Sequence, residues 1–319
     1  MPLPRVTALL AAYNEEDIIA QSVSALVAEG VRVHVIDDGS TDGTVAALDR
    51  LVASGRVTVE RRPPSENYAW TALLERKEAL ARTLDADWFI HADADEFRQG
   101  PWPGVGLREA IAIVDRLGYS AIDFFMFEFH PTTADPVAPD DVRQRLRHYA
   151  PRRDFDRFRI SCWKKQAAPV RLAPTGGHEV EFEGRRVFPL RFLLRHYPVR
   201  SQAHGERKVF GERRPRFRAD ERALGWHVQY DGLDRGASFL RDPATLREWD
   251  DDRARLEALV DSHTVDDLTR RLENERAARD EIGRRRDELA RRLDELLTSR
   301  SWRWTEPIRD LLRRLGGGS

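Results

Sequence analysis

The chain has 319 residues, of which 41% are hydrophobic and 34% charged, and its formal net charge is −1. This length gives room for one large domain with appendages, and the near-zero net charge provides no overall field that would attract nucleic acid or a membrane. The single cysteine, Cys162, excludes an internal disulfide and a zinc–thiolate cluster. Because there is neither a signal-peptide pattern nor an uncharged run of about 18 residues, we expect a cytoplasmic protein.

The N-terminal part of the chain alternates short apolar runs with helix-like segments. Apolar runs predict strands at 6–12, 31–36, 56–60 and 88–92, and apolar residues at helical spacing predict helices at 18–28, 44–53 and 69–84. Asn14 can cap the first of these helices, and Gly30 ends it. This βαβαβαβ order predicts an α/β fold with a Rossmann-like, mostly parallel sheet and helices on both faces.

Acidic side chains directly follow the second and fourth predicted strands. Asp37 and Asp38 come after 31–36, and Asp93 and Asp95 come after 88–92. Ligands of such sheets bind beyond the carboxyl ends of the strands, so both clusters should line one crevice. An isolated Asp-x-Asp is most often a solvated turn, but carboxylate oxygens converging from two strands suit Mg²⁺ or Mn²⁺.

The rest of the chain is less regular and ends in a charge-rich segment. A strand is expected at 121–129, a polar loop at 130–141, and shorter apolar pieces at 160–164, 179–182 and 192–194. Residues 264–298 read as a long charged helix with a damaged coiled-coil seam. It either pairs with a second copy, giving a homodimer, or folds back on its own body.

The tail 299–315 carries two tryptophans before a short stretch that Pro307 can open as a helix. Its apolar stripe, with arginines largely off it, suits a weak peripheral contact at the inner face of the cell membrane. Packing of the stripe on protein is the alternative. We interpret residues 316–319 as a linker scar.

Three motifs carry a family resemblance: VTALLAAYNEE, VHVIDDGSTDGT and DADWFIHADADEF. In order and spacing they resemble the opening of family 2 glycosyltransferases, which are nucleotide-sugar-dependent enzymes of the GT-A fold. PTGGHEVEFEG at 174–184 and LRHYPVRSQAHGERKVFGER at 194–213 resemble a bacterial polysaccharide-type branch. The resemblance implies a GT-A catalytic domain over 1–215, a helical or irregular connector over 216–263, and a C-terminal α-helical extension.

The resemblance also implies roles for particular residues. The partners would be a nucleoside-diphosphate sugar and a glycan or lipid-linked acceptor, and the cofactor a divalent metal, Mn²⁺ or Mg²⁺. The implied metal ligands are Asp93, Asp95 and His196. The implied nucleotide-sugar-binding residues are Ala12, Tyr13, Glu15, Asp37, Asp38, Asp93, Arg200 and Lys208. Glu179, beside His178, could take the acceptor proton, with Asp123 and Glu128 as rival bases.

The leading hypothesis is therefore a metal-dependent inverting glycosyltransferase of bacterial surface polysaccharide or glycoconjugate assembly. A catalytically inactive scaffold that binds nucleotide is the alternative. A nucleotidyltransferase would need a glycine-rich loop after the first strand, where AAYNEED has no glycine. A dinucleotide-binding oxidoreductase would need G-x-G-x-x-G after a strand, and no predicted strand is followed by it.

Overall fold

The structure, a computed structural model, describes residues 2–150, 158–218, 221–222, 231–262, 283–292 and 294–295. The chain forms two units, Met1–Ser262 and His263–Ser319. In the second unit, residues 283–292 and 294–295 are helical. The remainder of the expected long helix 264–298 and the whole tail 299–315 lie outside the described residues. Dimerisation and membrane contact therefore stay predictions from the sequence.

The first unit is built on a ten-stranded sheet with the order β10-β7-β6-β8-β4-β1-β2-β3, and β9 joins β5 to β6 beside this path. The strands are β1 (Val6–Ala12), β2 (Arg32–Asp37), β3 (Val57–Arg61), β4 (Trp88–Asp93), β5 (Glu96–Gln99), β6 (Ala121–Phe129), β7 (His148–Ala150), β8 (Ile160–Lys164), β9 (Phe192–His196) and β10 (Arg247–Glu248). The first four are mutually parallel, and β8, β7 and β5 add antiparallel pairs. The sheet is therefore mixed.

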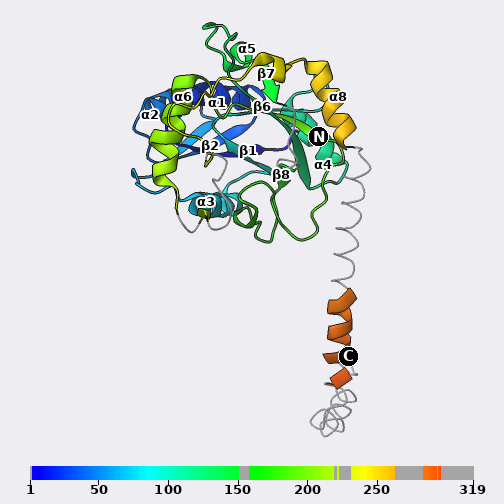
Figure 1. Ribbon diagram of the computed structural model, residues 1–319. Coiled ribbons are helices and arrows are strands. Elements are labelled where there is room, and N and C mark those ends of the chain that lie inside the picture. The colour runs from blue at the N-terminus through cyan, green and yellow to red at the C-terminus, as the bar shows by residue number, and fades with distance from the viewer. Residues whose placement is uncertain are drawn as a thin grey trace, which may run out of the picture. The chain divides into compact units, whose positions relative to one another are not determined.

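Helices cover both faces of this sheet. The α-helices are α1 (Ile19–Ala28), α2 (Thr44–Val52), α3 (Trp70–Thr83), α4 (Leu107–Arg116), α5 (Val142–Arg145), α6 (Gln202–Glu206) and α8 (Asp251–Ser262). A π-helical stretch, η3 (Arg207–Arg213), continues α6, and the short 3₁₀ turns are η2 (Ala173–Thr175), η4 (Arg214–Arg216) and η6 (Pro243–Thr245). In Figure 1, α1 and α2 lie on one side of the strands and α3 on the other.

Alternation along the strands explains these two layers. On β1, Ala8 and Leu10 pack with α1, α2 and α4, whereas Leu9 packs with α3. Successive strand residues point to opposite faces, so a run that is apolar at every position is buried on both sides. The α/β fold with helices on both faces is thus confirmed.

The structure corrects the expected role of Asn14 and shows where the end of the connector 216–263 packs. Asn14 does not cap α1, whose N-cap is Ile18. Instead, Asn14 adopts a positive φ of 53° and accepts a hydrogen bond from the Thr41 amide at 2.8 Å. The end of the expected connector belongs to the first unit, because Trp249 and Ala254 pack into a cluster with β6 residues such as Phe127.

Among the residues that the structure describes, none of the helices combines the length and the apolar character that a bilayer crossing requires. Cys162 is a free, buried thiol, as expected.

Candidate functional site

The two acidic clusters lie at one edge of the sheet. Ala12 at the end of β1 is in register with Asp37 on β2, and Ala11 is in register with Asp93 on β4. The parallel strands β1, β2 and β4 therefore end side by side, and the loops that follow them lie at the same edge of the sheet. The Asn14–Thr41 hydrogen bond ties the loop after β1 to the loop after β2.

Asp37 and Asp38 differ in how their carboxylates are satisfied. Asp37 is 2% exposed, and its Oδ1 has no hydrogen-bond partner among the described residues. Asp38 is paired with Arg62 at 3.1 Å and with Arg216 at 3.2 Å. Burial raises the pKa of Asp38, although both arginines oppose the change. An unpaired buried carboxylate oxygen is costly, so Asp37 is the better candidate for holding a ligand.

Asp95 lies between a lysine and a histidine that come from far along the chain. Its Oδ2 accepts from Lys208 Nζ at 2.9 Å, and its Oδ1 is 3.6 Å from His196 Nε2. Burial alone would raise the pKa of Asp95, but the positive charge of Lys208, with His196 and Arg200, outweighs it and holds this pKa below its ordinary value. Antiparallel pairing of β5 with β9 sets Glu96 opposite His196 and so brings His196 here.

Glu15 and Asp17 share an arginine. Arg200 donates from Nη2 to Glu15 Oε2 at 2.6 Å and to Asp17 Oδ1 at 2.7 Å. Burial acts to raise the pKa of each carboxyl. The neighbouring cations, Lys208 at Glu15 and Arg200 at both, outweigh burial and lower each pKa below its ordinary value, so both carboxyls stay ionised.

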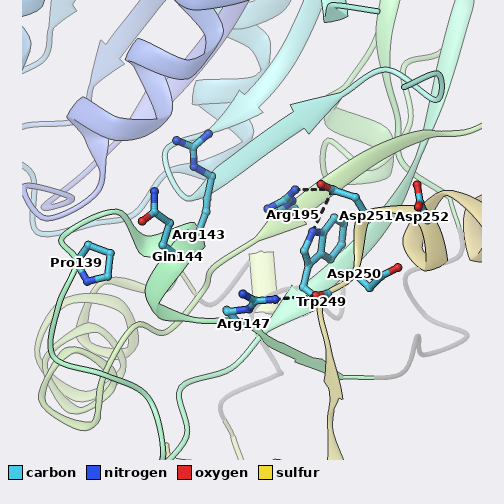
Figure 2. A pocket seen from close by; sticks show the side chains of 9 residues that line it. All are labelled: Pro139, Arg143, Gln144, Arg147, Arg195, Trp249, Asp250, Asp251 and Asp252. Carbon is cyan, nitrogen blue, oxygen red and sulfur yellow. Dashed lines mark hydrogen bonds and ion pairs between the residues drawn. The ribbon is translucent and has the colours of Figure 1, made fainter. Parts of the chain in front are cut away.

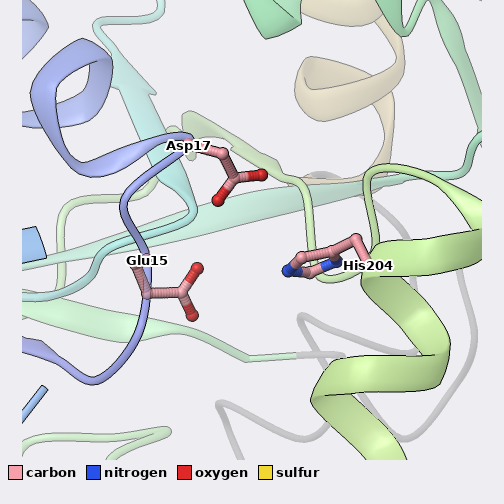
Figure 3. Close-up of side chains that lie close together, drawn as sticks. All are labelled: Glu15, Asp17 and His204. Atoms are coloured by element: carbon pink, nitrogen blue, oxygen red, sulfur yellow. The ribbon is translucent and has the colours of Figure 1, made fainter. Parts of the chain in front are cut away.

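A third group completes this cluster. Glu15, Asp17 and His204 offer oxygen and nitrogen atoms that all lie within 4.8 Å of one another, and Figure 3 shows His204 of α6 facing the loop after β1. Burial and the neighbouring Arg200 lower the pKa of His204 to about 3, so its ring is neutral. Since Arg200 already pairs with both acids and Lys208 pairs with Glu15, we interpret the cluster as an ion-pair network and not as a metal centre.

The glycine loop that precedes His178 and Glu179 packs against β4. Gly177 has φ +88°, and a Cβ there would lie 2.8 Å from His91 Nε2, so only glycine fits this approach. Burial, with a smaller effect of Arg159, lowers the pKa of His178 to about 4, whereas the nearby Asp93 carboxylate acts in the opposite direction. Glu179 pairs with Arg185 at 3.3 Å.

Two residues at this edge were not predicted. Lys77 of α3 is fully buried, and its Nζ donates to the Ala92 carbonyl at 2.9 Å and lies 3.7 Å from Asp93 Oδ1. Burial lowers its pKa to about 8. The signal was its place on the apolar stripe of α3, four residues after Leu73. Arg216, whose guanidinium lies 3.6 Å over the ring of Tyr13, has no comparable signal in the sequence.

A pocket of about 640 Å³ lies elsewhere and contains none of the predicted site residues (Figure 2). Arg195 and Trp249 line it, with the guanidinium 4.0 Å over the indole ring. Arg195 and His196 are neighbours on β9 and therefore face opposite sides. The three arginines that line this pocket, Arg143, Arg147 and Arg195, are ion-paired to Asp141, Glu248 and Asp251, and we assign the pocket no ligand.

One comparison with known proteins covers the segment that holds the acidic clusters. Residues 7–102 match the family model described as Glycosyl transferase family 2. This segment holds β1 to β5, and with them Asp37, Asp93 and Asp95. The segment is thus similar to a family 2 glycosyl transferase domain. No curated protein matches the chain.

Solved structures show weaker likenesses. S. aureus TarS 1–349 in complex with UDP is 14% identical, with 42% of this chain and 38% of that chain covered and a TM-score of 0.30. Glucosyl-3-phosphoglycerate synthase from Mycobacterium tuberculosis, in complex with Mn²⁺, UDP and glucosyl-3-phosphoglycerate, is 24% identical, with 39% and 44% covered and a TM-score of 0.26. The chain thus spans less than half the length of either, and we base no function on them.

Proposed function

We propose that the protein is a metal-dependent inverting glycosyltransferase. It moves a sugar from a nucleoside-diphosphate sugar to a glycan or lipid-linked acceptor in bacterial surface polysaccharide or glycoconjugate assembly. The observation that carries the proposal is Asp95. It is a buried, ionised carboxylate between β4 and β5, inside the segment that matches family 2, with His196 and Lys208 close to it.

The residues around Asp95 fit a divalent cation. Asp95 Oδ1 and His196 Nε2 are 3.6 Å apart. Adjacent ligands of an octahedral Mg²⁺ lie roughly 3 Å apart when each bond is about 2.1 Å, so the pair needs to close only slightly. Asp93 is the further carboxylate at the end of β4. A cation held here would supply charge stabilisation to a leaving diphosphate.

The ends of the parallel strands carry the residues that we propose bind the nucleoside-diphosphate sugar. Asp37 can accept a hydrogen bond from the base or the ribose through its unpaired Oδ1. Ala12, Tyr13 and Asp38 border the same edge. Arg200 and Lys208 supply positive charge, which suits a diphosphate. Glu15 holds both cations, with Lys208 Nζ at 3.3 Å and Arg200 Nη2 at 2.6 Å, and so keeps them beside Asp95.

The acceptor side is the loop with His178 and Glu179. Gly177 packs against His91 of β4. In our proposal, this contact puts the loop near Asp93, which ends the same strand. His178 is neutral at pH 7 and has a nitrogen lone pair that can accept a proton. Glu179 is the alternative base, and its ion pair with Arg185 would orient the carboxylate. Replacing each by Gln and comparing kcat separates the two, because only the base should lower kcat strongly with KM retained.

A nucleotide-sugar screen tests the function. Thermal shift and calorimetry with a panel of nucleoside-diphosphate sugars, with and without Mn²⁺, should find one donor that binds only with metal. Sugar release or transfer from that donor then separates an enzyme from a scaffold. Binding without any turnover would favour the inactive scaffold, and no binding by any donor would contradict both.

A further inference from the structure

Lys208 bridges two carboxylates at the candidate metal site. Its Nζ lies 2.9 Å from Asp95 Oδ2 and 3.3 Å from Glu15 Oε1. The side chains of Lys208, Asp95 and Glu15 are 6%, 9% and 4% exposed, respectively. A lysine ammonium is a compact point charge on a flexible stem, so it can act as a tethered cation on Asp95.

The charges around Lys208 are paired. The buried carboxylates of Glu15 and Asp95 and the more exposed carboxylate of Asp17 face the cations Arg200 and Lys208, and Arg213 lies 3.9 Å from Glu15. A doubly charged ion added to this set would leave uncompensated positive charge in a poorly solvated place. Repulsion between like charges is strong there. Either Lys208 must leave Asp95, or an anion must arrive with the metal.

The backbone around Lys208 is suited to such a change. Lys208 lies in η3 (Arg207–Arg213), a π-helical stretch that directly continues α6. Stretches of π-helix are rare and frequently occur at functional sites. Lys208 is held to Glu15 and Asp95 by ion pairs. A new charge nearby can break these pairs without any rearrangement of the hydrophobic core.

We propose that Lys208 is an internal counter-ion that competes with a divalent cation for Asp95. This inference rests on the proposed function. When the metal and the diphosphate bind together, Lys208 exchanges the carboxylate for the diphosphate. Metal alone therefore binds weakly, and the metal and the nucleotide bind cooperatively. Lys208 thereby sets the metal affinity of the site without being a metal ligand.

The experiment measures Mn²⁺ binding to the full chain without nucleotide, from the electron paramagnetic resonance signal of free Mn²⁺. Lys208→Gln should bind Mn²⁺ about tenfold more tightly than the parent, because the competing charge is gone. Lys208→Arg keeps the charge and should stay close to the parent. The matched control is Lys164→Gln. It removes a lysine of β8 that pairs with Asp115 of α4 at 2.7 Å.

Hydrogen exchange of the unmodified chain gives an independent test that does not require a variant to fold. Mn²⁺ alone should speed the exchange of amides in 207–213, because Lys208 loses its carboxylate anchor. Equal or weaker Mn²⁺ binding by a folded Lys208→Gln overturns the proposal, as does unchanged exchange at saturating Mn²⁺. Donor binding and transfer without this competition overturn only the inference. Competition without donor binding overturns only the proposed function.

Discussion

Arg191 donates from Nε to Asp123 Oδ2 at 2.7 Å, and neither side chain is exposed to solvent. The other oxygen, Asp123 Oδ1, accepts from the Arg159 amide at 2.8 Å. Asp123 lies on β6 with both carboxylate oxygens satisfied inside the protein. This arrangement suits a structural ion pair and does not suit a base that must reach an acceptor hydroxyl.

Asp123→Ala should therefore lower stability and not act on catalysis alone. Removing one partner of a buried pair takes away the carboxylate that faces the buried Arg191 charge, at a cost of about 3–5 kcal/mol. Urea denaturation measures the loss, and Glu128→Gln is the control because Glu128, on the same strand, is partly exposed. A stable Asp123→Ala protein that lacks only turnover would restore Asp123 as a candidate base.

Asp95→Ala should reduce transfer by at least about a hundredfold, because the charge that holds the metal to the diphosphate is lost. EDTA should reduce the activity of the parent similarly and should add nothing to the variant. Circular dichroism checks that the variant is folded. Activity that survives both the substitution and EDTA would contradict the metal-dependent reaction.

Asp37→Asn should weaken binding of the nucleoside diphosphate by about 1 kcal/mol, or roughly fivefold. The reason is that the carboxylate oxygen that accepts a hydrogen bond from the base or the ribose is replaced by an amide. Calorimetry with the nucleotide found in the screen measures it. The expected loss is in Kd and KM, with kcat nearly retained. Unchanged affinity would remove Asp37 from the donor site.

The pH dependence of stability should report the partly buried His178. Its pKa in the folded chain is about 4, below the ordinary value of 6.5, with burial as the main cause. The unfolded chain therefore takes up a proton between these values and the folded chain does not, so the free energy of unfolding falls as pH drops from 6.5 towards 4. His178→Asn should show a shallower fall in urea titrations. An identical slope would mean that His178 is protonated in the folded state.

The sequence alone determined the parts of this protein that depend on local pattern. Apolar residues placed β1, β2 and β4 within a residue or so of their observed bounds, because strands that pack between layers of helices are rich in apolar side chains. The same reasoning placed Asp37 and Asp93 at one edge, since parallel strands end together. Sequence periodicity predicted α1 but misassigned Asn14, because a positive φ and a hydrogen bond to the next loop leave no local signature.

Only the tertiary structure decided which charges meet. Arg200 pairs with Glu15 and Asp17, and Lys208 pairs with Asp95, although the partners are 185, 183 and 113 positions apart in the chain. The sequence identified these residues individually, but an ion pair requires only that two groups come within a few ångströms, and many alternative pairings satisfy the same composition. The choice follows from β9 pairing with β5 and from α6 and η3 lying over the strand ends. Burial then fixes it, because each cation that is removed from water must find a carboxylate.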